Sequence, residues 1–326
     1  MASGTLVIGE GTEDGKLHPV VPELIGIGSR LGGPVTVALL GSGVEGLAGE
    51  AGAFGANKVI VVDDAILKEY QGDAYAPVAE RIAKEVDPAV VLMGQTMMGR
   101  DLAPRLAQRL GTAVAMDCVN FEMQSDKLVA ERPAYGGSAR ARYTINGTPQ
   151  IATVRAKAQE APARDDSKQA EVVKEPAGVG EGDVRTRIVE RRKEKAEGVR
   201  LEDAKVVVSG GRGLGGPEGF KPLEELAEVL GGAVGASRAV CDLGWYPVPN
   251  QVGLTGKVVT PDLYIAVGIS GASQHMAGIS SVKNIVAINK DADASIFKAS
   301  RFAVAGDWKE IIPAFTAKVR ELKAAG

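Results

Sequence analysis

The sequence predicts an α/β protein built from two Rossmann-like domains with parallel sheets. Three observations favour this fold class. In the first part of the chain, short apolar segments alternate with helical segments of about 10–15 residues, which is typical of βαβ units. The last third repeats four times a short apolar strand that runs into a polar or glycine-rich turn. The length of 326 residues also fits two domains of ordinary size.

The first domain is expected to start with βα units and to end in an antiparallel extension. Strands are expected at Thr5–Ile8, Val35–Leu40, Lys58–Val62 and Ala89–Met93, with helices near Val20–Leu31, Val44–Ala53, Tyr75–Val86 and Asp101–Leu110. After Thr112 the pattern changes to short strands at Val119–Met123, Lys127–Arg132, Ala139–Ile145 and Gln150–Arg155. Because Asn-Gly is a strong turn signal, Asn146–Gly147 predicts a hairpin between the last two strands.

A solvated linker is expected between the domains. Glu160–Gly182 loses periodicity, and Asp183–Arg200 has eleven charged residues among eighteen. Acids and bases alternate there, which favours a linker with one edge strand around Arg187–Val189 over a nucleic-acid arm. The expected domains are therefore residues 1–182 and 201–326, joined by 183–200.

The four strands of the second domain predict a ligand crevice. They are Lys205–Val208, Leu263–Val267, Asn284–Ile288 and Phe302–Ala305, and the turns after them are Ser209–Gly216, Gly268–Gly271, Asn289–Asp291 and Gly306–Asp307. Helices are expected near Pro222–Leu230, Ser273–Ala277 and Trp308–Ala324, and Ala233–Thr260 is interpreted as an irregular functional loop. Because the carboxyl ends of parallel strands lie together, the four turns should meet where nucleotides bind in open α/β sheets.

Composition and termini argue against several classes of protein. A net charge of −3 gives no sign of a nucleic-acid or membrane partner, and 4% aromatic residues argue against base stacking. Met1–Glu10 lacks the features of a signal peptide and no apolar run reaches about 18 residues, so we expect a cytoplasmic protein. Cys118 and Cys241 fit no disulfide, metal or redox motif and are expected to be buried; no metal site is predicted.

Two strand–glycine–helix elements carry the strongest signals for a phosphate site. Ser209–Gly216 (SGGRGLGG) has five glycines, whose amides could point at an anion, and Arg212 adds a guanidinium suited to phosphate. A merely tight turn remains the alternative for this segment. In Leu263–Met276, Ser270 and the amides after Gly271 would face phosphate at a helix start. His275 lies about one turn into that helix, where a structural hydrogen bond is the alternative.

Other polar residues are weaker candidates. Thr255 lies between glycines in Asn250–Lys257, which exposes its hydroxyl to a ring with donors and acceptors, although a turn without a ligand fits equally well. Ser237 and Arg238 could simply cap a turn and pair with a surface carboxylate. Asn289 and Asp307 end strands and suit adenine and ribose hydroxyls, but Asp307 could equally cap the final helix.

Together these segments resemble the α subunit of electron-transfer flavoproteins. The matching segments are SGGRGLGG (Ser209–Gly216), Ser237–Arg238, the GW-P-N-QVG-TGK stretch (Gly244–Lys257), P-LYIAVGISGA-QH-AG (Pro261–Gly278), IVAINKD (Ile285–Asp291) and Asp307. The order and spacing of these segments agree with those of the family over nearly the whole second domain. In the first domain, Gly99–Leu110 and ERPAYGGSA (Glu131–Ala139) also resemble the family, but their sequences match it less closely.

The resemblance implies one FAD, bound mainly by a doubly wound second domain. Arg212, Ser270 and the backbone of Gly268–Gln274 would hold the pyrophosphate and ribitol. Ser237, Arg238 and Gln251–Thr255 would surround the isoalloxazine ring, with Thr255 near N5 and His275 near O2, and Asn289 and Asp307 would hold the adenosine. The full implied set is Arg212, Ser237, Arg238, Gln251, Val252, Gly253, Leu254, Thr255, Gly268, Ser270, Gly271, Ala272, Ser273, Gln274, His275, Asn289, Asp307 and Trp308. Leu254 stands where the family usually has glutamine.

The resemblance also implies an electron carrier that is not an enzyme by itself. It would pair with a homologous β subunit through its first domain. It would take electrons from flavin dehydrogenases, such as the acyl-CoA dehydrogenases of fatty acid β-oxidation, and pass them to a quinone reductase or a ferredoxin-type acceptor. Positive charge from Arg238 and His275 would raise the potential of the first one-electron step.

Two alternatives stay open. One is the α subunit of an electron-bifurcating assembly, whose β subunit would hold a second FAD and meet NADH. The other is a nicotinamide-dependent oxidoreductase, which is disfavoured because no second acid–base group accompanies His275.

Overall fold

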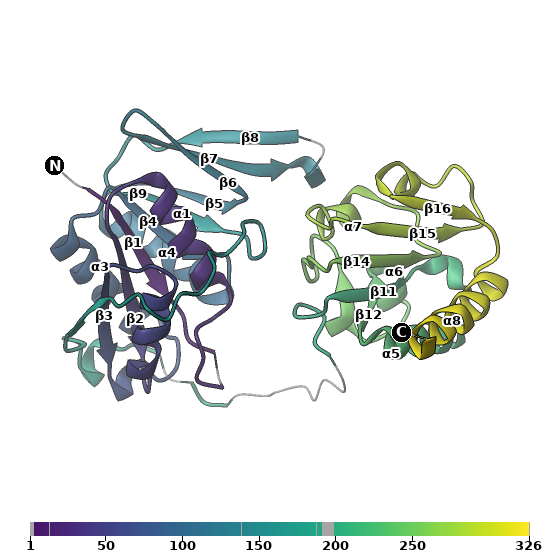
Figure 1. Ribbon diagram of the computed structural model, residues 1–326, viewed down its shortest axis with the longest axis horizontal. Coiled ribbons are helices and arrows are strands. Elements are labelled where there is room, and N and C mark those ends of the chain that lie inside the picture. Colours follow the sequence, from purple (N-terminus) through teal and green to yellow (C-terminus); the bar gives the residue numbers. More distant parts are fainter. Residues whose placement is uncertain (1–2, 13, 138, 187, 191–198, 326) are drawn as a thin grey trace. The chain divides into compact units, whose positions relative to one another are not determined.

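The computed structural model describes residues 3–12, 14–137, 139–186, 188–190 and 199–325 (Figure 1). The chain divides into two compact units, one of Met1–Arg132 with Arg140–Arg191 and one of Pro133–Ala139 with Arg192–Gly326. Each unit contains a parallel sheet with helices, and a smaller sheet with antiparallel pairing is also present. The predicted fold class, α/β with an antiparallel extension, is therefore confirmed.

A seven-stranded sheet forms the centre of the first unit. In spatial order its strands are β10 (Glu171–Lys174), β3 (Lys58–Asp63), β2 (Val35–Gly41), β1 (Thr5–Gly9), β4 (Val90–Gly94), β9 (Gln150–Val154) and β5 (Val114–Cys118), all paired in parallel. The helices are α1 (Val20–Leu31), α2 (Ala48–Ala53), α3 (Gly72–Val86) and α4 (Met97–Arg109). Helices α1 and α2 share one apolar core with residues such as Val7, and α3 and α4 share a second with Leu6, so both faces of the sheet are buried.

The predicted hairpin at Asn146–Gly147 is wrong. Strands β6 (Asn120–Gln124), β7 (Lys127–Ala134) and β8 (Ala139–Thr144) form a separate sheet in which β6 and β7 are antiparallel, whereas β9 lies in the parallel sheet between β4 and β5. A Cβ at Gly147 would lie 2.3 Å from Oγ1 of Thr112, so the glycine serves a close approach of two segments. The extension therefore has three strands, and β5 is a strand that the sequence pattern did not reveal.

The segment Glu160–Gly182 is not a linker throughout. Strand β10 lies within it and pairs in parallel with β3 at the edge of the sheet. Its four residues are mostly exposed and charged at both ends, so they carry no apolar pattern from which a strand could be predicted. The edge strand expected around Arg187–Val189 is not formed at Ile188 or Val189, and Arg187 lies outside the described residues.

A six-stranded parallel sheet forms the second unit. In spatial order its strands are β13 (Gln251–Val252), β12 (Ala233–Ser237), β11 (Val206–Gly210), β14 (Leu263–Val267), β15 (Ile285–Asn289) and β16 (Phe302–Ala305). The helices are α5 (Lys221–Leu230), α6 (Arg238–Asp242), α7 (Ser273–Ala277) and α8 (Trp308–Ala325). Helices α5 and α8 lie side by side against the sheet (Figure 1). The strand order reverses direction between β11 and β14, which is the topological switch point of the sheet.

The stretch Ala233–Thr260 is more regular than its composition suggested. It contains β12, which pairs with β11, as well as α6 and the short strand β13. Most residues of β12 are small and have low strand propensity, so the strand could not be predicted from them, but the packing around β12 requires small residues. A Cβ at Gly235 would lie 3.0 Å from a methyl group of Val252 and 3.1 Å from Oγ of Ser209.

Cys118 and Cys241 are buried and free, as expected. Among the described residues, no helix is both long enough and apolar enough to cross a membrane. Within the same part of the chain, no cluster of three or more His, Cys, Asp or Glu side chains is arranged to bind a metal ion.

Glu10, directly after β1, links the stability of the first unit to pH. Its carboxylate accepts a hydrogen bond from Oγ1 of Thr96 at 2.6 Å, and burial raises the pKa of Glu10 from 4.5 to about 7. Between these two values the unfolded chain releases a proton that the folded chain retains, so the free energy of unfolding falls as the pH rises through this window.

Glu10→Gln should therefore raise the free energy of unfolding by about 1–3 kcal/mol at pH 8 and leave it almost unchanged at pH 4. Urea unfolding of the full chain across this pH range measures the effect. Glu23, whose pKa burial also raises to about 7, will preserve part of the slope. Glu228→Gln, an exposed change on α5, serves as the control. A Glu10→Gln profile parallel to that of the parent would contradict the assignment.

Candidate functional site

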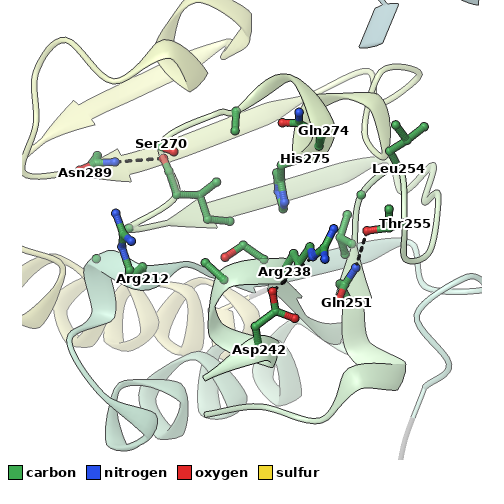
Figure 2. Close-up of a pocket in the computed structure, with 18 of the residues that line it drawn as sticks. Arg212, Arg238, Asp242, Gln251, Leu254, Thr255, Ser270, Gln274, His275 and Asn289 are labelled. Carbon is green, nitrogen blue, oxygen red and sulfur yellow. Dashed lines mark hydrogen bonds and ion pairs between the residues drawn. The ribbon is translucent and has the colours of Figure 1, made fainter. Parts of the chain in front are cut away.

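A cavity of about 670 Å³ lies at the carboxyl ends of the strands of the second unit (Figure 2). Its lining comes from β13 and from the segments that follow β11, β12, β13, β14 and β15, as expected for a doubly wound sheet. The cavity contains most of the residues singled out from the sequence: Arg212, Ser237, Arg238, Gln251, Val252, Gly253, Leu254, Thr255, Gly268, Ser270, Ala272, Gln274, His275 and Asn289. Its volume is in the usual range for small-molecule and cofactor sites.

Four of the predicted site residues do not line the cavity. Gly271 and Ser273 belong to the same turn and helix start as Ser270 but are not among the residues that line the cavity. Asp307 accepts a hydrogen bond from the amide of Lys309 at 3.0 Å, so it caps α8, and it also pairs with Lys290 at 3.0 Å. Trp308 is buried in the core beside α5, and its Nε1 donates to the carbonyl of Gly213 at 3.2 Å.

The cavity also has lining residues outside the full implied set: Gly213, Ala239, Asp242, Asp291 and Ile269, the last of which was expected only as part of the Gly268–Gln274 backbone. Asp242 matters most, because its carboxylate pairs with Nε of Arg238 at 3.2 Å. The two side chains are one helical turn apart on α6, so their four-residue spacing was a readable signal. Both side chains are more than 60% exposed, which means that the pair is screened by solvent.

Two of the glycines after β11 hold two turns together. The amide of Gly211 donates to the carbonyl of Val267 at 2.9 Å, and the amide of Gly213 donates to that of Gly268 at 3.0 Å. A Cβ at Gly268 would lie 2.8 Å from the carbonyl carbon of Gly213. The tight-turn alternative therefore applies to these two amides, and Arg212 alone of this motif offers a charged donor to the cavity.

The turn after β14 does present open amides. Gly268 and Gly271 have φ values of 63° and 86°, which glycine adopts without the strain that a side chain would impose. Within the described residues, no acceptor takes a hydrogen bond from the amides of Ser270, Gly271 or Ala272. Figure 2 shows Arg212 at the same end of the cavity as Ser270 and Asn289. This end can bind an anion through backbone donors and one guanidinium.

Asn289 has a structural role in addition to lining the cavity. Its Nδ2 donates to the carbonyl of Ile269 at 3.0 Å, and its Oδ1 accepts from the amide of Asp291 at 3.1 Å. The side chain thus ties the turn after β15 to the turn after β14.

Beside a second cavity, of about 440 Å³, a carboxylate of the protein itself takes the position that an anion would occupy. The cavity lies in the first unit beside the turn that follows β2. There the carboxylate of Asp63 already accepts from the amides of Gly43 at 2.8 Å and Glu45 at 3.1 Å. The amides of Gly43 and Glu45 are therefore satisfied by the protein, whereas those of Ser270, Gly271 and Ala272 have no acceptor among the described residues.

The opposite end of the larger cavity offers hydroxyl and amide donors. Nε2 of Gln251 donates to Oγ1 of Thr255 at 3.0 Å, which leaves the Thr255 hydroxyl hydrogen directed elsewhere. The amide of Leu254 donates to the carbonyl of Gln274 at 2.8 Å and fastens this loop to α7. The Leu254 side chain is 67% exposed, so the loop is fixed here through its backbone.

His275 extends from α7 toward the middle of the cavity (Figure 2). The residue is only 7% exposed, and its Nε2 lies 2.9 Å from the hydroxyl of Tyr264. Nδ1 is buried and has no hydrogen-bond partner of standard geometry among the described residues. Burial lowers the pKa of His275 to about 4, with the backbone of Val252 opposing weakly, so the imidazole is neutral at pH 7. The expectation that His275 adds positive charge is therefore wrong, and the positive charge of this cavity comes from its arginines.

Comparisons with known proteins agree with this geometry. A family model described as an electron transfer flavoprotein domain matches residues 5–179, and one described as an electron transfer flavoprotein FAD-binding domain matches residues 200–280. The electron transfer flavoprotein subunit alpha of Thermoanaerobacterium thermosaccharolyticum is 45% identical over 316 residues, 95% of this chain and 96% of that protein. The subunit alpha of Bacillus subtilis is 43% identical over 324 residues, 99% of each chain. Protein FixB of Clostridium saccharobutylicum is 41% identical over 319 residues, 96% of this chain and 95% of that protein.

Proposed function

Because this chain belongs to the electron transfer flavoprotein family, in its alpha-subunit branch, we propose that it binds one FAD in the cavity of its second unit and carries electrons within a heterodimer. One observation carries the FAD part of the proposal. At one end the cavity has the turn amides of Ser270 and Ala272, which have no acceptor among the described residues, and in the middle it has a buried imidazole nitrogen with no partner of standard geometry there. Buried polar groups are normally hydrogen-bonded, so this cavity fits a ligand that supplies acceptors at both places.

The donors match the two chemical ends of FAD. The amides of Ser270, Gly271 and Ala272, together with the guanidinium of Arg212, suit the pyrophosphate. The Thr255 hydroxyl and the His275 imidazole suit the heteroatoms of the isoalloxazine ring. Asn289 would meet the adenosine side through its backbone or through the second hydrogen of Nδ2, because Nδ2 and Oδ1 each already make one hydrogen bond within the protein. Asp307 and Trp308 would act indirectly, by capping and packing α8.

FAD, when bound, supplies redox chemistry in steps of one electron. The chain tunes that chemistry by placing donors and charge around the ring. Arg238 contributes a cation whose field Asp242 partly offsets. His275 contributes a neutral donor that needs no proton exchange with solvent, because it is buried and uncharged at neutral pH.

The proposed carrier works with other proteins and is not an enzyme by itself. A homologous beta subunit would bind the first unit, in line with relatives that are named as alpha subunits. Flavin dehydrogenases of the acyl-CoA dehydrogenase type would supply electrons, and a quinone reductase or another acceptor would receive them. A bifurcating assembly would differ in the beta subunit, which would hold a second FAD and meet NADH.

The test is co-purification of the full chain with its beta subunit, followed by flavin counting after denaturation. We expect one FAD per alpha chain that depends on residues 201–326, together with reduction in one-electron steps. A chain ending at Arg200 should retain the beta subunit and lose this FAD. A second FAD on the beta subunit would favour bifurcation. A colourless complex that binds a nicotinamide nucleotide would contradict the proposal.

A further inference from the structure

Tyr264 does not line the cavity of the second unit, but it contacts His275, which does. Tyr264 is on β14 and is fully buried, and its hydroxyl lies 2.9 Å from Nε2 of His275. Their ring centroids are 6.1 Å apart at an interplanar angle of 57°, so the contact is a hydrogen bond and not stacking. This bond is the one polar interaction of standard geometry that the described residues make with the imidazole nitrogens of His275.

We propose that Tyr264 is a positioning residue, which donates its hydroxyl hydrogen to Nε2 of His275 and thereby fixes the tautomer that presents Nδ1–H to the cavity. This inference rests on the proposed function, because it names the group that would meet the flavin. A neutral imidazole carries one hydrogen, and the nitrogen that accepts a hydrogen bond cannot be the one that carries it. The direction of this buried bond therefore bears directly on whether Nδ1 carries a hydrogen, and the backbone of Val252, which opposes the fall in the His275 pKa as an acceptor would, favours the same tautomer.

The direction follows from what surrounds the pair. Burial raises the pKa of the Tyr264 phenol and lowers that of His275 to about 4, so the phenol keeps its hydrogen and the imidazole stays neutral. Ser209 is also fully buried and lies near the Tyr264 hydroxyl, although the two groups do not reach standard hydrogen-bond geometry. Ser209 opposes the rise in the Tyr264 pKa, which is the effect of a donor to the phenol oxygen. If Ser209 donates to Tyr264 and Tyr264 donates to His275, both hydroxyl hydrogens have an acceptor.

The reverse arrangement makes the same number of hydrogen bonds but leaves a different hydrogen without an acceptor. If Nε2 carried the hydrogen, Tyr264 would accept it and turn its own hydrogen toward Ser209, and the Ser209 hydrogen would have no acceptor in a fully buried place. Nδ1 would then offer a lone pair to the cavity. In the first arrangement the remaining hydrogen is on Nδ1, and there the backbone of Val252 opposes the fall in the His275 pKa, as an acceptor would. A flavin ring that gains negative charge on reduction needs a donor there, so only the first arrangement favours the reduced state.

The decisive measurement reads the tautomer directly. The chain has two histidines, His18 and His275, so nitrogen-15 labelling of histidine yields two ring systems, which His18→Gln assigns. The full chain should be measured with its beta subunit, first without flavin and then with FAD. We expect the His275 hydrogen on Nδ1 with at least a tenfold preference in both states. A hydrogen on Nε2 of the unaltered protein would overturn the proposal, whatever any variant does.

Two variants test whether the Tyr264 hydroxyl causes the tautomer preference of His275. Tyr264→Phe keeps the ring in the core and removes only the hydroxyl, and it should reduce the tautomer preference at least fivefold. The potential of the first one-electron step should fall by up to about 59 mV, which corresponds to a tenfold change in the equilibrium constant of that step. Ser209→Ala keeps the bond between Tyr264 and His275 but removes the hydroxyl hydrogen that would lack an acceptor in the reverse arrangement, so it should also lower the tautomer preference. An unchanged preference in a folded Tyr264→Phe protein would overturn the proposal.

The two proposals fail in different ways. If FAD does not bind but the flavin-free protein shows the Nδ1 hydrogen and loses the preference in Tyr264→Phe, the tautomer assignment is supported and the proposed function is wrong. If FAD binds and the hydrogen is on Nε2, the proposed function stands and the role of Tyr264 is overturned.

Discussion

Gly268→Ala is expected to weaken FAD binding by about 10- to 100-fold. The residue has a φ of 63°, which an alanine would relax away from in the free protein; restoring this conformation on binding costs about 1–2 kcal/mol, and each 1.4 kcal/mol is a tenfold change in affinity. In addition, the new methyl group would meet the backbone of Gly213 at 2.8 Å. The turns after β11 and β14 would have to separate, and the amides that follow Gly268 would lose their alignment with the pyrophosphate.

A matched control is available in the neighbouring turn. Gly215 has a φ of 86°, but a Cβ there would have no heavy atom within 4 Å, and Gly215 does not line the cavity. Gly215→Ala therefore carries the same kind of backbone strain without the collision. Flavin titration of both variants measures the dissociation constants, and circular dichroism checks the fold. Equal affinities for Gly268→Ala and Gly215→Ala would show that the contact between the turns is unimportant for binding.

The sequence predicts the location of the cavity well because the location depends on topology. Apolar strands that end in glycine or polar residues are readable, and parallel strands bring their carboxyl ends together. Arg212, Ser270 and His275 therefore come together although they are far apart in sequence. The hairpin prediction at Asn146–Gly147 failed for the converse reason: a local turn signal was outweighed by the pairing of β9 with β4, which is remote in sequence.

The chemical state of the site residues could not be predicted in the same way. A glycine-rich turn shows that amides are accessible but not what they donate to, and the amides of Gly211 and Gly213 donate to the neighbouring turn. The charge of His275 depends on burial, which is set by the packing of α7 over β14 and not by the residues next to it in sequence. The roles of Asp307 and Trp308 likewise depend on the direction of each side chain at the start of α8.

The charge balance at Arg238 leads to a pair of opposite predictions for the redox potential. Arg238→Ala should lower the potential of the first one-electron step by about 60 mV. A hydrogen bond to a charged group contributes about 1.5–3 kcal/mol, and 1.4 kcal/mol corresponds to 59 mV for one electron. The lower end of that range applies because the side chain is 64% exposed and its field is screened. Arg238→Lys keeps the charge and should retain most of the potential.

Asp242→Asn should shift the same potential in the opposite direction, because it removes the carboxylate that pairs with Arg238 at 3.2 Å. Redox titration of the FAD-loaded heterodimer at low and high ionic strength measures both shifts, and each should shrink as salt is added. The two variants are informative together, since a general loosening of α6 would move the potential in the same direction for both. Opposite signs would identify the charge itself as the cause, and equal signs would rule out an electrostatic role for this pair.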